Sequence, residues 1–189
     1  MNILMINGSH RMGGNTEVLL KIMEEEFEKC QIDWDLLSLA GLSVEHCKVC
    51  DHCAGAPECG IHDDFDAILK KVIATDALII GSPVYVGAPS SKVMTFIQRL
   101  TYLSHSKHHL LKDKVGGAVI VAGEAGHLTA LNILVDVFLV NGMTVLGSQY
   151  WPIGTASAKG GITGHASAIE NIRHLSQKIV RHLQKTGAK

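Results

Sequence analysis

ILMINGSHRMGGNT, residues 3–16, is the stretch that decides the fold. It begins with an apolar run that ends in turn residues, and this order predicts a short buried strand. A helix is predicted to begin near Asn15. Its buried face would hold Val18, Leu19, Ile22, Met23 and Phe27. A buried strand, a glycine-rich turn and an amphipathic helix together indicate the first unit of a parallel α/β sheet.

The same alternation of strand and helix continues along the chain. Further apolar strands are predicted at residues 32–39, 77–80, 117–121 and 143–150. Further helices are predicted to begin at Asp63-Asp64, beyond Pro89, at Leu128 and at Ala166. Right-handed crossovers place helices on both faces of such a sheet. We therefore expect one α/β domain over residues 1–189, doubly wound around a five-stranded parallel sheet.

The charge balance of the chain argues against a polyanionic partner. Lys and Arg total 17 against 18 for Asp and Glu, so no overall field favours nucleic acid or an anionic membrane surface. We expect a small-molecule partner instead. No apolar run approaches the roughly 18 residues that span a bilayer. The first residues also lack the basic and apolar regions of a signal peptide, so we expect a cytoplasmic protein.

Residues 8–16, which join the first strand to the first helix, have the features of an anion site. Unpaired N–H groups and the positive end of the dipole at a helix N-terminus favour a bound phosphate. Ser9, Asn15 and Thr16 offer short donors, and Arg11 offers a bidentate guanidinium. Gly13-Gly14 let the backbone curl around the anion. The alternative is an ordinary helix cap with glycine in the turn.

Two other phosphate-binding motifs do not match this loop. A Walker A loop requires Gly-Lys-Ser/Thr where the chain has Gly14-Asn15-Thr16. A dinucleotide fingerprint requires G-x-G-x-x-G, and Gly8-Ser9-His10 breaks it. A terminal monophosphate therefore fits the loop better than a pyrophosphate.

Two further loops follow predicted strands, and ligands of doubly wound sheets bind at such carboxyl ends. Residues 81–87, GSPVYVG, combine apolar groups with one aromatic side chain, which suits a flat, half-apolar ring. Backbone N–H groups from Val84 to Gly87 are placed to contact the ring edge, with Tyr85 beside the ring. The alternative is that Tyr85 and Pro83 fill the core. The third loop spans residues 122–127.

Four cysteines lie in an irregular segment at residues 40–62: Cys47, Cys50, Cys53 and Cys59. The leading C-x₂-C-x₂-C steps match the run that holds a cubane cluster in bacterial ferredoxins. Zinc sites more often separate two CxxC pairs by a dozen or more residues. The spacing favours a [4Fe–4S] cluster, while free thiols, a reversible disulfide and zinc stay open as alternatives.

Four motifs in fixed order resemble the NADPH-dependent FMN reductase family, especially its iron–sulfur flavoprotein branch. They are Gly8-Ser9-x-Arg11-x-x-Gly14-Asn15-Thr16, Cys47-x-x-Cys50-x-x-Cys53, Asp63-Asp64 and Ser82-Pro83-Val84-Tyr85. The resemblance implies a flavodoxin-like sheet of strand order 2-1-3-4-5. It implies that the FMN phosphate is bound by Ser9, Arg11, Gly14, Asn15 and Thr16. It also implies that the isoalloxazine ring is bound by Pro83, Val84, Tyr85, Val86, Gly87 and Gly123. Relatives often have a Gly-Gly pair where this chain has Glu124-Ala125, so the third loop departs from the pattern.

The expected function is electron transfer through FMN, from NAD(P)H or a reduced carrier such as ferredoxin to an acceptor, with a [4Fe–4S] cluster on the way. The cofactor supplies that chemistry, and no side chain is assigned as a catalyst. The resemblance also implies a homodimer or homotetramer. The alternatives are a reductase without a cluster, a non-catalytic electron carrier and a zinc-stabilised interaction module.

Overall fold

The computed structural model describes residues 1–56 and 58–187. The strands are β1 (Asn2–Asn7), β2 (Asp33–Ser38), β3 (Ala77–Tyr85), β4 (Ala88–Pro89), β5 (Val115–Ala122), β6 (Thr144–Val145) and β7 (Ile153–Thr155). The helices are α1 (Asn15–Lys29), α2 (His52–Gly55), α3 (Phe65–Ala74), α4 (Ser91–Ser106), α5 (His127–Val140), the 3₁₀ turn η1 (Gly161–Gly164) and α6 (Ala166–Thr186). None of these helices is long and apolar enough to cross a membrane.

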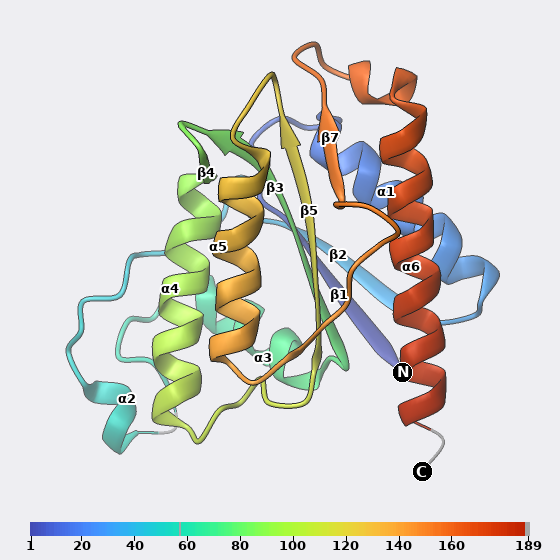
Figure 1. The fold of residues 1–189 in the computed structure, drawn as a ribbon. Coiled ribbons are helices and arrows are strands. Elements are labelled where there is room, and N and C mark those ends of the chain that lie inside the picture. The colour runs from blue at the N-terminus through green and yellow to red at the C-terminus, as the bar shows by residue number, and fades with distance from the viewer. Residues whose placement is uncertain (57, 188–189) are drawn as a thin grey trace.

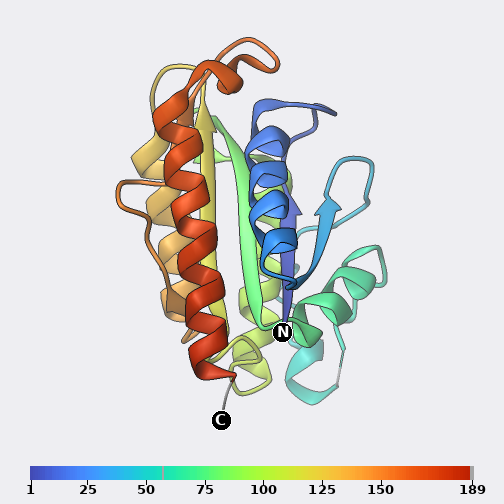
Figure 2. The same ribbon diagram turned by 90° about the vertical axis from the view of Figure 1, so that its right-hand side faces the viewer.

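The sheet forms the middle of three layers. Its strands run in the order β2-β1-β3-β5-β6, all parallel, while β7 also pairs with β5 and β4 pairs antiparallel with β3. Helices α1 and α6 lie side by side on one face, and α3, α4 and α5 cover the other (Figures 1 and 2). The segment with α2 connects β2 to α3. The doubly wound α/β arrangement is therefore confirmed.

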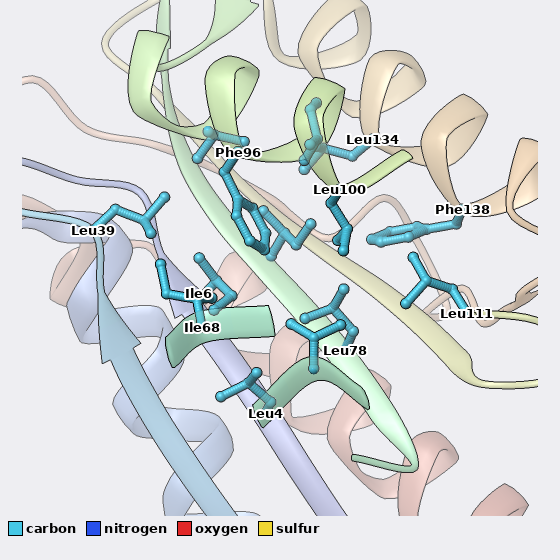
Figure 3. Packing of buried hydrophobic residues seen from close by; sticks show 14 of the residues in the cluster. Leu4, Ile6, Leu39, Ile68, Leu78, Phe96, Leu100, Leu111, Leu134 and Phe138 are labelled. Carbon is cyan, nitrogen blue, oxygen red and sulfur yellow. The ribbon is translucent and has the colours of Figure 1, made fainter. Parts of the chain in front are cut away.

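Alternate residues of each central strand enter opposite cores. In β1, Leu4 and Ile6 pack with α3, α4 and α5, whereas Ile3 and Met5 pack with α1 and α6. Figure 3 shows the first of these cores. Since both faces of a parallel sheet are covered, its strands appear in the sequence as unbroken apolar runs. This explains why the central strands were predictable.

The prediction of five strands in the order 2-1-3-4-5 was right only in part. The five predicted regions do follow one another in that spatial order, but the sheet has seven strands and its main path is numbered β2-β1-β3-β5-β6. One addition comes from residues 81–87, which were predicted as a loop. The strand β3 continues to Tyr85 and then turns back through Val86 and Gly87 into β4. Both turn residues have positive φ, 51° and 75°, and such a turn matches the twist of paired strands.

The other addition comes from the last predicted strand, residues 143–150. Only Thr144–Val145 pair with the start of β5, and the chain rejoins β5 at Ile153–Thr155. Pro152 precedes the second piece and has no N–H to donate to a ladder. The apolar pattern of this region therefore overstated the length of the edge strand.

Candidate functional site

A cleft of about 240 Å³ lies at the carboxyl ends of β1, β3, β5 and β7. Figure 1 shows the ends of β3, β5 and β7 at its top. Nine predicted cofactor residues line it: Ser9, Arg11, Gly14, Asn15, Thr16, Pro83, Val84, Tyr85 and Gly123. The lining is completed by Val121, Ala122, Ala156 and Ser157. Val86 and Gly87 lie outside the lining, at the tip of the β3–β4 hairpin. The fold thus brings all three predicted loops to one place.

The first loop presents an uncapped helix end to this cleft. The N-cap of α1 is Gly14, in extended conformation, and no side chain of the described residues caps the helix there. Gly14 N–H donates to the Arg11 carbonyl at 3.0 Å, and Arg11 N–H donates to Ser9 Oγ at 3.2 Å. The first N–H groups of α1 are therefore left for a ligand, and they attract an anion.

Gly14 is required by close packing within the loop. A Cβ there would lie 2.9 Å from the Arg11 carbonyl oxygen and 3.1 Å from Ser9 Oγ. The first two loops are also joined directly, since Gly8 N–H donates to the Gly81 carbonyl at 2.8 Å. The geometry of the anion loop is therefore fixed without a ligand.

Asn15 uses its side chain inside the protein. Its Nδ2 donates to the carbonyls of Ala156 at 3.0 Å and Ala158 at 2.8 Å. Its Oδ1 accepts from Ile162 N–H at 3.3 Å. These three hydrogen bonds direct the Asn15 side chain to the segment after β7. Asn15 therefore offers a ligand its backbone N–H. Its side chain positions a loop that the sequence did not associate with the site.

The second and third loops contact each other beyond the cleft. A Cβ at Gly126 would lie 3.0 Å from both Gly87 Cα and Val84 Cγ1, and Gly126 has a φ of 89°. Tyr85 is half exposed and Val86 is fully exposed at the hairpin tip. A β-branched residue with positive φ is uncommon, and such strain gathers at functional sites. The hairpin tip is therefore exposed to solvent beside the cleft and contains one residue in a strained conformation.

His127 is a buried residue that the sequence did not single out. Its Nε2 lies 3.1 Å from the Gly154 carbonyl and 3.1 Å from Thr155 Oγ1, so it joins the start of α5 to β7. Just beyond, Ala156 N–H donates to the Ala122 carbonyl and Ser157 Oγ donates to the Gly123 carbonyl. These bonds fix the wall formed by residues 155–157. In the sequence, the signal for this wall is the glycine-rich stretch that follows the last predicted strand, residues 143–150.

A larger groove of about 590 Å³ runs between α4 and α5. Apolar side chains such as Met94, Ile97 and Ile133 line it. It lacks the helix N-terminus and backbone donors of the strand-end cleft. The strand-end cleft is therefore the better candidate for a phosphorylated cofactor.

The four clustered cysteines are free thiols in different environments. Cys53 and Cys59 are buried, Cys47 is half-buried and Cys50 is exposed. Within residues 1–56 and 58–187, no group of three or more His, Cys, Asp or Glu side chains is arranged to hold a metal ion. In this conformation the cysteines do not fit a cluster. A cluster would require part of the segment to move.

Arg99 of α4 fastens the cysteine segment to the body of the protein. It is 1% exposed, and its Nη1 donates to both Asp63 oxygens, at 2.7 and 2.8 Å. Its Nε donates to Cys59 Sγ at 3.3 Å, and its Nη2 donates to the Ile61 carbonyl. Its guanidinium carbon also lies 4.2 Å from the centroid of the Phe65 ring. One buried cation thus organises the end of the segment.

Asp63 is stabilised as a carboxylate at this point. Burial acts to raise its pKa, but the Glu45 N–H, the Arg99 guanidinium and the Phe65 N–H bind the carboxylate and lower the pKa below its usual value. Because Glu45 and Asp63 flank the cysteines in sequence, the same carboxylate holds both ends of the segment.

The part of the cysteine segment around α2 lies away from the strand-end cleft. Tyr102 Oη donates to Asp51 beside α2, and this bond raises the pKa of Tyr102 to about 12. Tyr102 is in the second half of α4, whereas the cleft adjoins the strand ends near the start of α4 (Figure 1). No cysteine of the described residues lines the cleft, and α2, which contains Cys53, lies near the other end of α4.

Known proteins resemble the whole chain. An iron–sulfur flavoprotein of Methanocaldococcus jannaschii is 32% identical over 186 residues, which are 95% of each chain. A WrbA-like flavodoxin of Agrobacterium tumefaciens superposes with a TM-score of 0.68 at 19% identity, over 97% of this chain and 98% of that one. FerB of Paracoccus denitrificans, an NAD(P)H:(acceptor) oxidoreductase, superposes with a TM-score of 0.71 at 18% identity, over 97% of each chain.

These structural likenesses confirm the flavodoxin-like fold. The sequence model of NADPH-dependent FMN reductases matches residues 1–158, which include the anion loop, the hairpin and the third loop. The chain therefore belongs to the NADPH-dependent FMN reductase family and is a flavin-dependent oxidoreductase.

Proposed function

We propose that the strand-end cleft binds FMN and passes electrons from NAD(P)H, or from a ferredoxin-like carrier, to an acceptor. The observation that supports this most is the uncapped N-terminus of α1, which shares one cleft with Arg11 and the β3–β4 hairpin. The phosphate would contact Ser9, Arg11, Thr16 and the backbone at Gly14 and Asn15. The ring would contact Pro83, Val84, Tyr85, Val86, Gly87 and Gly123.

Bound FMN supplies the redox chemistry, and the protein supplies position and charge. The first N–H groups of α1 and the Arg11 guanidinium balance the phosphate charge. The ordered backbone of the hairpin gives N–H and carbonyl groups for the polar edge of a ring, with Tyr85 beside it. Arg11 is the one charged side chain in the described lining, so we assign no side chain as a proton donor or acceptor.

The first prediction concerns Arg11. Arg11→Gln removes the charge that faces the phosphate while keeping a polar side chain. We expect FMN to bind about 10- to 100-fold more weakly, because a hydrogen bond to a charged group contributes about 1.5–3 kcal/mol. Quenching of flavin fluorescence on titration measures this. Arg181→Gln, on the exposed face of α6, is the matched control.

The test of the function starts with the purified wild-type protein. Flavin absorbance, or its return after reconstitution with FMN, is expected, followed by acceptor-dependent oxidation of NADH or NADPH. A colourless protein that cannot be reconstituted would contradict the proposal. Flavin binding without oxidation of either nucleotide would instead favour the non-catalytic electron carrier.

We infer further that Cys47, Cys50, Cys53 and Cys59 are ligands of a [4Fe–4S] cluster. Their spacing and the name of the Methanocaldococcus relative support this inference. The buried and exposed thiols must first come together, so we derive no electron path through them.

The second prediction tests the cysteines by analysis of anaerobically purified protein. Iron and acid-labile sulfide in equal amounts are expected in the wild type, and their loss is expected in Cys50→Ala, which alters an exposed thiol. Cys30→Ala, also exposed but outside the segment, is the control. Flavin bands without iron would contradict the cluster. Zinc and thiol chemistry would then be the two alternatives, and metal analysis would distinguish them.

We also propose a homo-oligomer, for which the face of α5 gives support. This helix has Asp136 as its one Asp, Glu, Lys or Arg residue, and it exposes Leu128, Leu139 and Val140. Large apolar side chains that are exposed together on one helix are typical of a surface that contacts another protein chain. Light scattering of the purified protein distinguishes a monomer from a dimer or tetramer.

A further inference from the structure

The segment that follows β7 lies against the anion loop. Asn15, the first residue of α1, accepts or donates hydrogen bonds with Ala156, Ala158 and Ile162. Asn15 is 8% exposed, so these bonds are shielded from water. The residues that they join are separated by 141 to 147 positions along the chain. Residues 156–162 are therefore fastened to the same helix end that faces the cleft.

Lys159 is the charged residue at the centre of this segment. A Cβ at Gly13 would lie 3.4 Å from Lys159 Cε and 3.7 Å from its Nζ. Gly13 has a φ of 62°, a conformation that favours glycine, so a side chain does not compete with the lysine for this place. Lys159 is exposed, and it forms no ion pair with the part of the chain that the structure describes. Its ammonium group thus stands free beside the anion loop.

The charged side chains around this loop do not fully balance a bound phosphate. The Glu17 carboxylate accepts from Gly13 N–H at 2.8 Å, but Lys21 lies 3.2 Å from it and offsets its charge. Arg11 is the cation of the cleft lining. A phosphate monoester has a charge of about −1.5 to −2 at pH 7, more than one guanidinium balances.

We propose that Lys159 is a second cation for the phosphate group in the first loop, held in place by the Asn15 hydrogen bonds. The proposal rests on FMN binding in the cleft. It adds a binding residue that comes from the far end of the chain and a fourth loop that closes the phosphate end of the site.

The third prediction compares FMN with riboflavin, which has the same ring but no phosphate. Lys159→Gln is expected to weaken FMN binding about tenfold, the effect of losing one charge-assisted contact, and to leave riboflavin binding unchanged. The loss should shrink as salt is raised, because exposed charges are screened. Lys178→Gln, exposed on α6 and outside the segment at residues 156–162 that lies against the anion loop, is the control.

The outcomes separate this proposal from the proposed function. Unchanged FMN affinity in Lys159→Gln, with FMN bound by the wild type, would overturn the role of Lys159 alone. An equal loss for FMN and riboflavin would also overturn it, since that would indicate a general disturbance of the cleft. A wild-type protein that binds neither flavin would instead overturn the proposed function.

A double variant tests the fastening role of Asn15. Asn15→Ala keeps the backbone N–H at the helix end but removes the three side-chain hydrogen bonds. If Asn15 holds Lys159 in place, adding Lys159→Gln to Asn15→Ala should change FMN affinity much less than it does in the wild type. Equal effects in both backgrounds would show that Asn15 does not position the lysine. Circular dichroism confirms that each variant is folded.

Discussion

Replacing Arg99 with leucine is expected to lower the free energy of unfolding by about 3–5 kcal/mol, the usual result of removing one partner of a buried ion pair. Arg99 and Asp63 are 1% and 9% exposed at their side chains, and Asp63 would keep a buried charge without its cation. The Cys59 thiol and the Ile61 carbonyl would lose their donors as well. Chemical denaturation of the purified variant measures the change.

A matched variant separates burial from charge. Lys71→Leu removes the cation of the ion pair with Asp35, in which the side chains are 50% and 44% exposed. Exposed pairs contribute about 0–1 kcal/mol, so this variant should be nearly neutral. Equal losses in the two variants would contradict the role given to Arg99.

Arg99→Leu should also act locally. Both ends of the cysteine segment depend on the Arg99–Asp63 pair, since Asp63 binds Glu45 N–H at 2.8 Å. We expect limited proteolysis to cut residues 45–62 of the variant before the rest of the chain. Cleavage elsewhere first would indicate that the segment is held by other contacts.

Acidification is expected to remove a second contribution to the free energy of unfolding, which comes from Glu26. This carboxylate of α1 is 8% exposed at its side chain and contacts Arg173 of α6 at 2.7 Å. The hydrogen bond from Lys29 is the largest cause that lowers the pKa of Glu26, to about 2; burial acts against it, and Gln177 and Arg173 act with it. The interaction thus joins two helices on one face of the sheet.

The direction of the pH effect follows from the lowered pKa. The stabilisation is complete above the ordinary pKa of 4.5 and is lost as the pH falls toward the folded value of about 2. One pKa unit corresponds to about 1.4 kcal/mol, and the exposure of Lys29 and Arg173 to water reduces the total to about 2–3 kcal/mol.

Glu26→Gln makes this effect measurable. The wild type should exceed the variant by about 2–3 kcal/mol at pH 7, and the difference should be about half as large near pH 3. Denaturation at a series of pH values provides the comparison. Glu25→Gln, at the exposed carboxylate 3.1 Å from Arg173, is the control and should show a small difference. A wild-type advantage that does not change with pH would contradict the assignment.

Arg99 shows a signal that the sequence contained and the predictions did not use. It lies three residues after Phe96 and four before Leu103, on the apolar face of α4. A charged residue in that position indicates a buried partner. The partner itself, Asp63, was predicted only as the start of a helix, which begins two residues later at Phe65. Its contact with Arg99 depends on how α4 packs against the segment before α3.

The sequence by itself determined the alternating strands and helices and the loop at residues 8–16. Apolar runs identify strands covered on both sides, and the anion loop contains its donors and glycines within nine consecutive residues. Both features are local. The tertiary structure decided the β3–β4 hairpin, the divided edge strand, the separation of the cysteines and the position of Lys159 beside Gly13. These features depend on contacts between distant segments, and such contacts form only when the helices and loops pack around the completed sheet.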